Sequence, residues 1–170
     1  PPAFAGALTV DARLAGGLDA LVVDGSLEAL ESRVEVEGTL SGVMAEPSFE
    51  GQATLSNENV GRLLEAVGLL AGEAPPLFAT PVVVEAKFDG TASDFEVDLR
   101  TSLSEADVRV SGRLEELTGT PRVDLEGEFS HPNLARLLRA ADLLENGAPG
   151  ALAAPVTLNG SAKGEMAGLE

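Results

Sequence analysis

The sequence predicts a mainly β protein (α+β), a curved antiparallel meander sheet that carries one short helix in each of two tandem repeats. Three observations predict this fold. Apolar and charged residues alternate with period two over most of the chain, the period changes to 3.6 in two short segments, and the whole pattern recurs after about 74 residues.

The repeat defines the organisation of the chain. The segment that starts at Asn57 aligns without a gap with the segment that starts at His131. The same register holds from residue 8 to residue 164 with roughly 30 % identity, which is typical of a repeat array. We therefore expect one domain, 1–170, with repeat one at about 8–81, repeat two at about 82–155 and the start of a third repeat at 156–170.

Four strands are predicted in each repeat, and a ninth begins the third repeat. In the strand that starts at Val82, Val84 and Phe88 point to one side, whereas Glu85 and Lys87 point to the other. The same alternation recurs around 95–100, 107–114 and 122–129, and in repeat one around 8–14, 21–23, 34–40 and 49–55. Turn segments that contain glycine, at 15–17, 89–90 and 118–121, separate several of these strands and indicate antiparallel neighbours.

A helix is predicted after the fourth strand of each repeat, because the apolar spacing there changes to i, i+3, i+4 and i+7. The residues expected to pack these helices are Val60, Leu63, Leu64, Val67, Leu134, Leu137 and Leu138. Ser56 or Asn57 can cap the first helix. Ser130 or His131 precedes Pro132, which suits the first helical position of the second helix.

An area estimate indicates that two helices cannot cover the apolar side of this sheet. Nine strands at about 4.8 Å spacing give a width of about 43 Å, whereas two helices of about 10 Å each cover about 20 Å. The rest of the apolar side is either a closed core or a groove for an apolar ligand, and the sequence leaves both alternatives open. The candidate residues that line it are Val10, Leu14, Val34, Val36, Leu40, Phe49, Phe88, Phe95, Val97, Val108, Val110 and Phe129.

The composition argues against several classes of function. The formal net charge is -17, so the chain lacks the cationic surface that binds nucleic acids or anionic membranes. The absence of cysteine excludes disulfides and thiol chemistry. No stretch reaches the roughly 18 apolar residues of a membrane span, and the first residues lack the pattern of a signal peptide. We expect the chain to be a segment of a longer protein.

The polar residues favour structural roles over catalysis. His131 is the only histidine, and its counterpart one repeat earlier is Asn57, so we expect His131 to support the start of a helix. Asn59 and Asn133 recur at the helix starts and are expected to bond to nearby backbone, with a ligand contact as the alternative. The acidic residues alternate along strands as a solvated face does, and no calcium loop, phosphate-binding glycine loop or nucleophile elbow occurs. The sequence therefore predicts no enzyme, metal site or cofactor.

The glycine, leucine and asparagine pattern resembles the repeats of the AsmA-like family, which includes TamB-type proteins. It comprises residues 49–55 with Asn59, Leu63 and Leu64 in repeat one. In repeat two it comprises residues 110–114, 123–129, 131–134 and 137–138. A Pro-Val pair follows in both. The resemblance implies a repeating β-groove in a periplasmic protein of a Gram-negative bacterium. It also implies an inner-membrane anchor in the parent protein and a role in outer-membrane biogenesis through lipid movement.

Two functions from different classes follow as hypotheses. In the first, phospholipid acyl chains lie along an apolar β-groove while the headgroups stay in water. In the second, the apolar side is closed, no ligand binds, and the chain is a structural or protein-interaction module that uses its sheet edges for β-augmentation. In either case we expect further repeats of the parent chain to pair with those edges.

Overall fold

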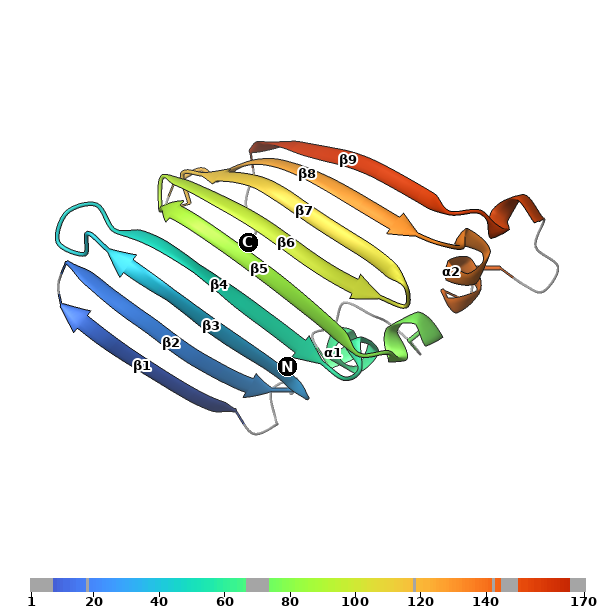
Figure 1. The fold of residues 1–170 in the computed structure, drawn as a ribbon, viewed down its shortest axis with the longest axis horizontal. Coiled ribbons are helices and arrows are strands. Elements are labelled where there is room, and N and C mark those ends of the chain that lie inside the picture. Colours follow the sequence, from blue (N-terminus) through green and yellow to red (C-terminus); the bar gives the residue numbers. More distant parts are fainter. Residues whose placement is uncertain are drawn as a thin grey trace.

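The sheet of this protein is a single open meander of nine antiparallel strands (Figure 1). The computed structural model describes residues 8–17, 19–66, 74–117, 119–141, 143–144 and 150–165. Each strand pairs with its neighbours in the sequence, so the predicted fold class is confirmed. The strands are β1 (Thr9–Gly17), β2 (Ala20–Ala29), β3 (Ser32–Ser41), β4 (Ser48–Asn57), β5 (Val82–Thr91), β6 (Asp94–Leu103), β7 (Ala106–Glu115), β8 (Arg122–His131) and β9 (Val156–Glu165).

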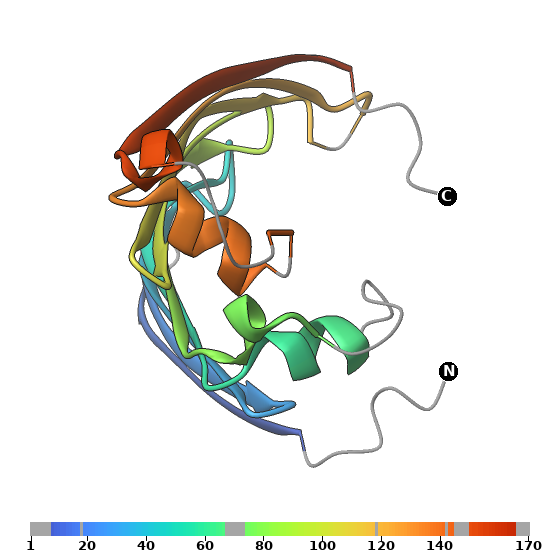
Figure 2. The ribbon, with the colours of Figure 1, turned by 90° about the vertical axis from the view of Figure 1, so that its right-hand side faces the viewer.

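Two short helices lie at one end of the strands. The helix α1 is described over Val60–Ala66 after β4, and α2 is described over Leu134–Ala140 after β8. Each is followed by a 3-10 turn, η2 (Pro76–Ala79) before β5 and η3 (Gly150–Ala153) before β9. The helices pack mainly against these 3-10 turns. The sheet is curved, and both helices lie on its concave side (Figure 2).

Two hairpins turn through pairs of non-glycine residues with positive φ. Leu30 and Glu31 join β2 to β3 with φ values of 52° and 60°. Ser104 and Glu105 join β6 to β7 with φ values of 49° and 70°. A two-residue turn with this geometry is usually Asn-Gly, because the left-handed region costs other residues on the order of 1 kcal/mol each. These turns therefore depend on contacts with the rest of the chain.

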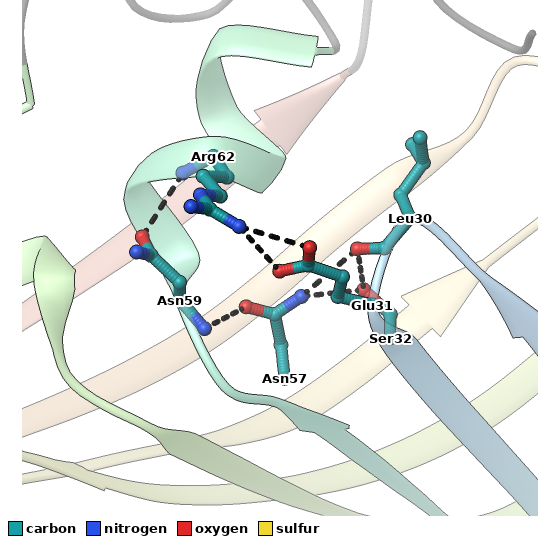
Figure 3. Close-up of polar contacts among 6 residues, drawn as sticks. All are labelled: Leu30, Glu31, Ser32, Asn57, Asn59 and Arg62. Carbon is teal, nitrogen blue, oxygen red and sulfur yellow. Dashed lines mark hydrogen bonds and ion pairs between the residues drawn. The ribbon is translucent and has the colours of Figure 1, made fainter. Parts of the chain in front are cut away.

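In repeat one, the last residue of β4 provides such a contact (Figure 3). The Asn57 Nδ2 group donates to the Leu30 carbonyl at 3.3 Å and to Ser32 Oγ at 2.8 Å. Its Oδ1 accepts from the Asn59 N–H at 2.7 Å. The Arg62 guanidinium on α1 then pairs with Glu31 at 2.9 Å. We call this set of contacts a turn latch, because it ties the hairpin to both the strand end and the helix.

Repeat two builds the same latch with a histidine. His131 Nδ1 accepts from the Asn133 N–H at 2.9 Å, and Nε2 lies 3.1 Å from the Ser104 carbonyl. Because Nδ1 is an acceptor, the neutral ring carries its proton on Nε2 and donates it to Ser104. Arg136 on α2 pairs with Glu105 at 2.9 Å, as Arg62 pairs with Glu31 in repeat one.

The residue that follows each turn offers a side-chain acceptor only where the latch side chain has a second proton to donate. Asn57 has two amide protons, and Ser32 accepts the second. Neutral His131 has one ring proton, and the residue equivalent to Ser32 is Ala106, which is buried and offers no acceptor. Asn57 and His131 are both 3 % exposed, so an unused donor at either position would be costly.

The helix starts differ partly from the expectation. The side chains of Asn59 and Asn133 accept from the backbone N–H three residues later, at 3.2 and 3.0 Å, so their predicted bonding to backbone is confirmed. The expectation that Asn57 caps the first helix is wrong, because its Nδ2 donates to the hairpin and its Oδ1 accepts from the N–H of Asn59, the residue that caps. His131 supports the start of the second helix as expected, because its Nδ1 accepts from the N–H of the capping residue Asn133. Pro132 lies before the cap and not in the first helical turn.

Two expected turns lie inside strands. The segment 15–17 is the paired end of β1. The pair Asp89-Gly90 belongs to β5, and the chain reverses at Ala92 and Ser93. Gly90 adopts a φ of 143°, and a Cβ at this position would lie 2.1 Å from the Asp94 carbonyl oxygen. The glycine is therefore required for the close approach of β5 and β6 and not for the turn itself.

Exchanging the two latches tests this account. Replacing His131 with Ala should lower the free energy of unfolding by about 1–3 kcal/mol, because the partly buried Ser104 carbonyl and Asn133 N–H lose their partner. His131→Asn should lose less, and adding Ala106→Ser to it should recover stability by accepting the second amide proton. Urea unfolding followed by circular dichroism measures all four proteins. Equal stability of His131→Ala and the native chain would contradict the latch.

Candidate functional site

The strand register gathers the apolar side chains on one face. Directly opposed residues share a face of a sheet, and the pairing is continuous from β1 to β9. Four rows of opposed residues cross the sheet on this side, one residue from each strand in order from β1 to β9, and together we call them the apolar face. The rows are Val10-Leu27-Val34-Leu55-Val84-Thr101-Val108-Phe129-Leu158; Ala12-Gly25-Val36-Ala53-Ala86-Leu99-Val110-Gly127-Gly160; Leu14-Val23-Gly38-Gly51-Phe88-Val97-Gly112-Leu125-Ala162; and Gly16-Leu21-Leu40-Phe49-Gly90-Phe95-Leu114-Val123-Gly164. Thr101 alone in these rows is polar, and its hydroxyl donates to the Val83 carbonyl at 2.8 Å.

All twelve of the residues singled out as lining candidates lie in these four rows. The pairing therefore brings Val10, Leu14, Val34, Val36, Leu40, Phe49, Phe88, Phe95, Val97, Val108, Val110 and Phe129 to one face. Val10 and Leu14 lie at its margin, because β1 is the outermost of the described strands, and they are 62 % and 68 % exposed. The other ten are half-buried.

The apolar face is not sealed by the described part of the chain. Among the described residues, Ala106 and Ala135 are the only buried apolar side chains, and no large side chain is fully buried. Leu99, in the middle of the sheet, is still 36 % exposed. The row of residues nearest the helices contains the buried Ser32, Asn57, Ala106 and His131 on the same side as the apolar face. The helices lie on the concave side at this end of the sheet (Figure 2). The four rows of the apolar face stay half-buried to exposed among the described residues.

Three phenylalanines form a cluster on the apolar face. The rings of Phe49 and Phe88 are stacked with centroids 5.3 Å apart, and those of Phe88 and Phe95 are stacked at 6.0 Å. The ring of Phe49 lies over two glycines, since a Cβ on Gly38 or Gly51 would come within 2.6 and 3.0 Å of its ring atoms. The glycines thus let an aromatic ring lie flat across neighbouring strands, which makes this part of the face smooth and apolar.

The helix-packing candidates are less buried than expected. Val60, Leu63, Leu64, Leu134, Leu137 and Leu138 are all half-buried. Val67 lies outside the described residues. The most buried positions of the two helices are instead small residues at equivalent places, Gly61 and Ala135. A Cβ on Gly61 would lie 2.5 Å from the Ala74 Cβ, so α1 approaches the chain before η2 closely at this point.

The opposite face of the sheet is charged and forms exposed ion pairs. Asp98 on β6 accepts from Arg100 at 3.2 and 3.3 Å and from Arg109 on β7 at 2.7 Å. These hydrogen bonds, from Arg100 first and then from Arg109, lower the pKa of the Asp98 carboxyl. A hollow of about 380 Å³ on this side includes Glu85, Asp107 and Glu128 in its lining. Val83 and Val108 also line it, so the hollow is mixed in character and would bring an apolar ligand against several charged side chains.

The described residues contain no group of three or more histidine or acidic side chains placed to hold a metal ion. None of the helices in the described part is long and apolar enough to cross a bilayer. What the arrangement does offer is a wide, uncharged and accessible surface, and its chemistry is that of binding apolar groups.

Comparison with known proteins adds no family to this description. The chain matches no protein-family model, no curated protein and no solved structure.

The lowered pKa of Asp98 gives a pH-dependent contribution to stability. Its carboxylate is stabilised in the folded chain, so the contribution is present above the unfolded pKa of about 4 and is lost as the pH falls through the folded value. The difference in unfolding free energy between the native chain and Asp98→Asn should therefore be present at neutral pH and shrink in strong acid. Asp89→Asn, on the same face without an ion pair to a described residue, is the control. A difference that does not change with pH would contradict this assignment.

Proposed function

We propose that this chain is a non-enzymatic, lipid-carrying segment whose apolar face holds the acyl chains of a phospholipid. One observation carries the proposal: four rows of apolar residues run across the whole sheet, and the described residues leave them accessible. Each buried CH₂ group contributes about 0.8 kcal/mol, so a chain of about 16 carbons could gain on the order of 10 kcal/mol. A passive conduit needs no catalytic group, and the face offers none.

The resemblance to AsmA-like repeats extends this proposal to a setting. In it, the parent is a periplasmic protein of a Gram-negative bacterium, anchored in the inner membrane, that moves phospholipid during outer-membrane biogenesis. The sheet order supports the repeat-array part of this proposal, because β1 and β9 are the outermost strands and each has an edge without a described partner. Further repeats of the parent would pair there and continue the apolar face.

A structural or protein-interaction module is the second candidate function. The same two edge strands favour it, because an edge of nine or ten residues can add a strand from another protein by β-augmentation. The two candidates differ in whether lipid occupies the apolar face.

A tryptophan probe tests lipid occupancy, since the native chain contains no tryptophan. Phe88→Trp places the probe on the apolar face beside Phe49 and Phe95. Its emission should move to shorter wavelength when dispersed phospholipid is added, because acyl chains replace water around the ring. Gln52→Trp, on the charged face, is the matched control and should not respond. A folded Phe88→Trp protein that shows no response to phospholipid would contradict the lipid-carrying proposal.

A charge placed on the apolar face should abolish the response. Val110 pairs with Leu99 and Gly127 in the middle of the face, and Asp at this position would have to be desolvated under an acyl chain. In the Phe88→Trp background, Val110→Asp should weaken lipid binding at least about tenfold. Ser111→Asp adds the same charge one residue later on the opposite face and should bind normally. Equal weakening by both variants would show a general charge effect instead.

A further inference from the structure

The outer edge of β1 lacks two common protections of a sheet edge. Among the described residues β1 pairs only with β2, and all nine residues of β1 are exposed. Its pairing with β2 is continuous without a bulge, and it contains no proline. Such features often protect an edge strand, because its outward N–H and C=O groups can pair with another chain. The outer edge of β1 is therefore a place where a strand can add.

The large side chains of β1 are the most exposed of the apolar face. Val10 and Leu14 are 62 % and 68 % exposed, and Leu8, which precedes β1 in the same alternation, is 66 % exposed. In the middle of the sheet Leu99 is 36 % exposed, since strands flank it on both sides. A strand added beside β1 would give its apolar side chains the same flanking contacts.

The topology restricts how a second copy can reach this edge. The outermost strands β1 and β9 run in the same direction, because all neighbouring strands are antiparallel (Figure 1). If the apolar faces of two copies lie on the same side of a joined sheet, β1 of one copy can meet β9 of the other only in parallel. An antiparallel contact requires identical edges, β1 with β1 or β9 with β9, related by a two-fold axis.

The charges of β1 are self-complementary in one antiparallel register. When two copies pair around Ala12, Asp11 of each copy lies opposite Arg13 of the other. Centring the pair on Asp11 or on Arg13 opposes like charges, and centres farther along the strand leave both charges without such a partner. Within one chain Arg13 Nε lies 3.9 Å from Asp11 Oδ1, and the two side chains are 81 % and 67 % exposed. Arg13 also lies opposite Asp24 on β2, so the contact would place a carboxylate on either side of it.

The edge of β9 lacks this complementarity. Its charged residues Lys163 and Glu165 already pair with Asp124 and Arg122 on β8. A β9 pair that opposes Lys163 to Glu165 is centred on Gly164, at the end of the strand, so only the last described residues of β9 would pair with each other. The charges therefore favour β1 as the edge that meets its own copy.

We propose that β1 is a self-association edge, through which two copies of this chain join their sheets antiparallel around Ala12. The dimer has two reciprocal Asp11–Arg13 ion pairs on the charged face, while Val10 and Leu14 oppose each other on the apolar face. The apolar faces of the two copies then form one continuous surface. The inference goes beyond the proposed function and does not depend on lipid. It concerns the edge of β1 when no further repeat of a parent chain is paired with it.

Sedimentation velocity over about a hundredfold range of protein concentration tests the dimer. The native chain should shift from monomer to dimer as its concentration rises. Arg13→Asp places carboxylates against carboxylates across the two-fold axis, so the dissociation constant should rise at least about tenfold at low salt. The matched control Lys163→Asp makes the same charge change on the edge of β9 and should leave the dimer intact. Circular dichroism checks that each variant is folded.

Exchanging the two charges tests the register. The double variant Asp11→Arg with Arg13→Asp opposes unlike charges again and should dimerise about as tightly as the native chain. A native chain that stays monomeric at every concentration, or a charge-exchanged variant that does, would overturn the proposal. A dimer that Lys163→Asp weakens would place the contact at β9. A dimer that Val110→Asp abolishes and Arg13→Asp does not would place it on the apolar face, and either result would overturn pairing through β1.

Discussion

Strict alternation held in one register over nine strands is the constraint on which this structure depends. Because opposed residues share a face, every strand adds its apolar side chains to the same surface and its charged side chains to the other. A slip of one residue in any strand would place Glu, Asp or Arg residues among the apolar rows. The register is fixed by short turns, and two of them, at Leu30-Glu31 and Ser104-Glu105, adopt positive φ and are supported by the latches.

The latches couple this sheet to its helices. Asn57 and His131 each contact the hairpin between the second and third strands of their repeat and the residue that caps the following helix. The helices are thereby placed at the strand ends, where they pack on 3-10 turns and leave the four apolar rows accessible. A helix spread over the sheet would have closed that face. In the described part of the chain, the position of these helices at the strand ends thus leaves the apolar face partly exposed instead of closing it into a core.

Much of the fold could be predicted from the sequence, because alternation and the repeat offset are local signals. These signals predict the nine strands, the positions of the helices, and that residues such as Phe88 and Val110 share one face of the sheet.

The turn latches were not predicted, although Glu31 and Arg62 recur as Glu105 and Arg136 at the repeat offset. Their partners are distant in the chain, and no glycine marks the turns. Conversely, the glycine in Asp89-Gly90 suggested a turn, whereas it serves a close approach between strands. The burial of Gly61 and Ala135 could not be predicted, because it depends on how closely each helix approaches the 3-10 turn after it.

The accessible apolar face is the central claim, and native mass spectrometry tests it most directly. The chain, purified without detergent and then incubated with phospholipid, should show mass additions equal to whole phospholipid molecules. The Val110→Asp variant should show none while it keeps the circular dichroism spectrum of a folded sheet. A native chain that is folded and remains free of lipid under both conditions would contradict the account and leave the structural module as its function.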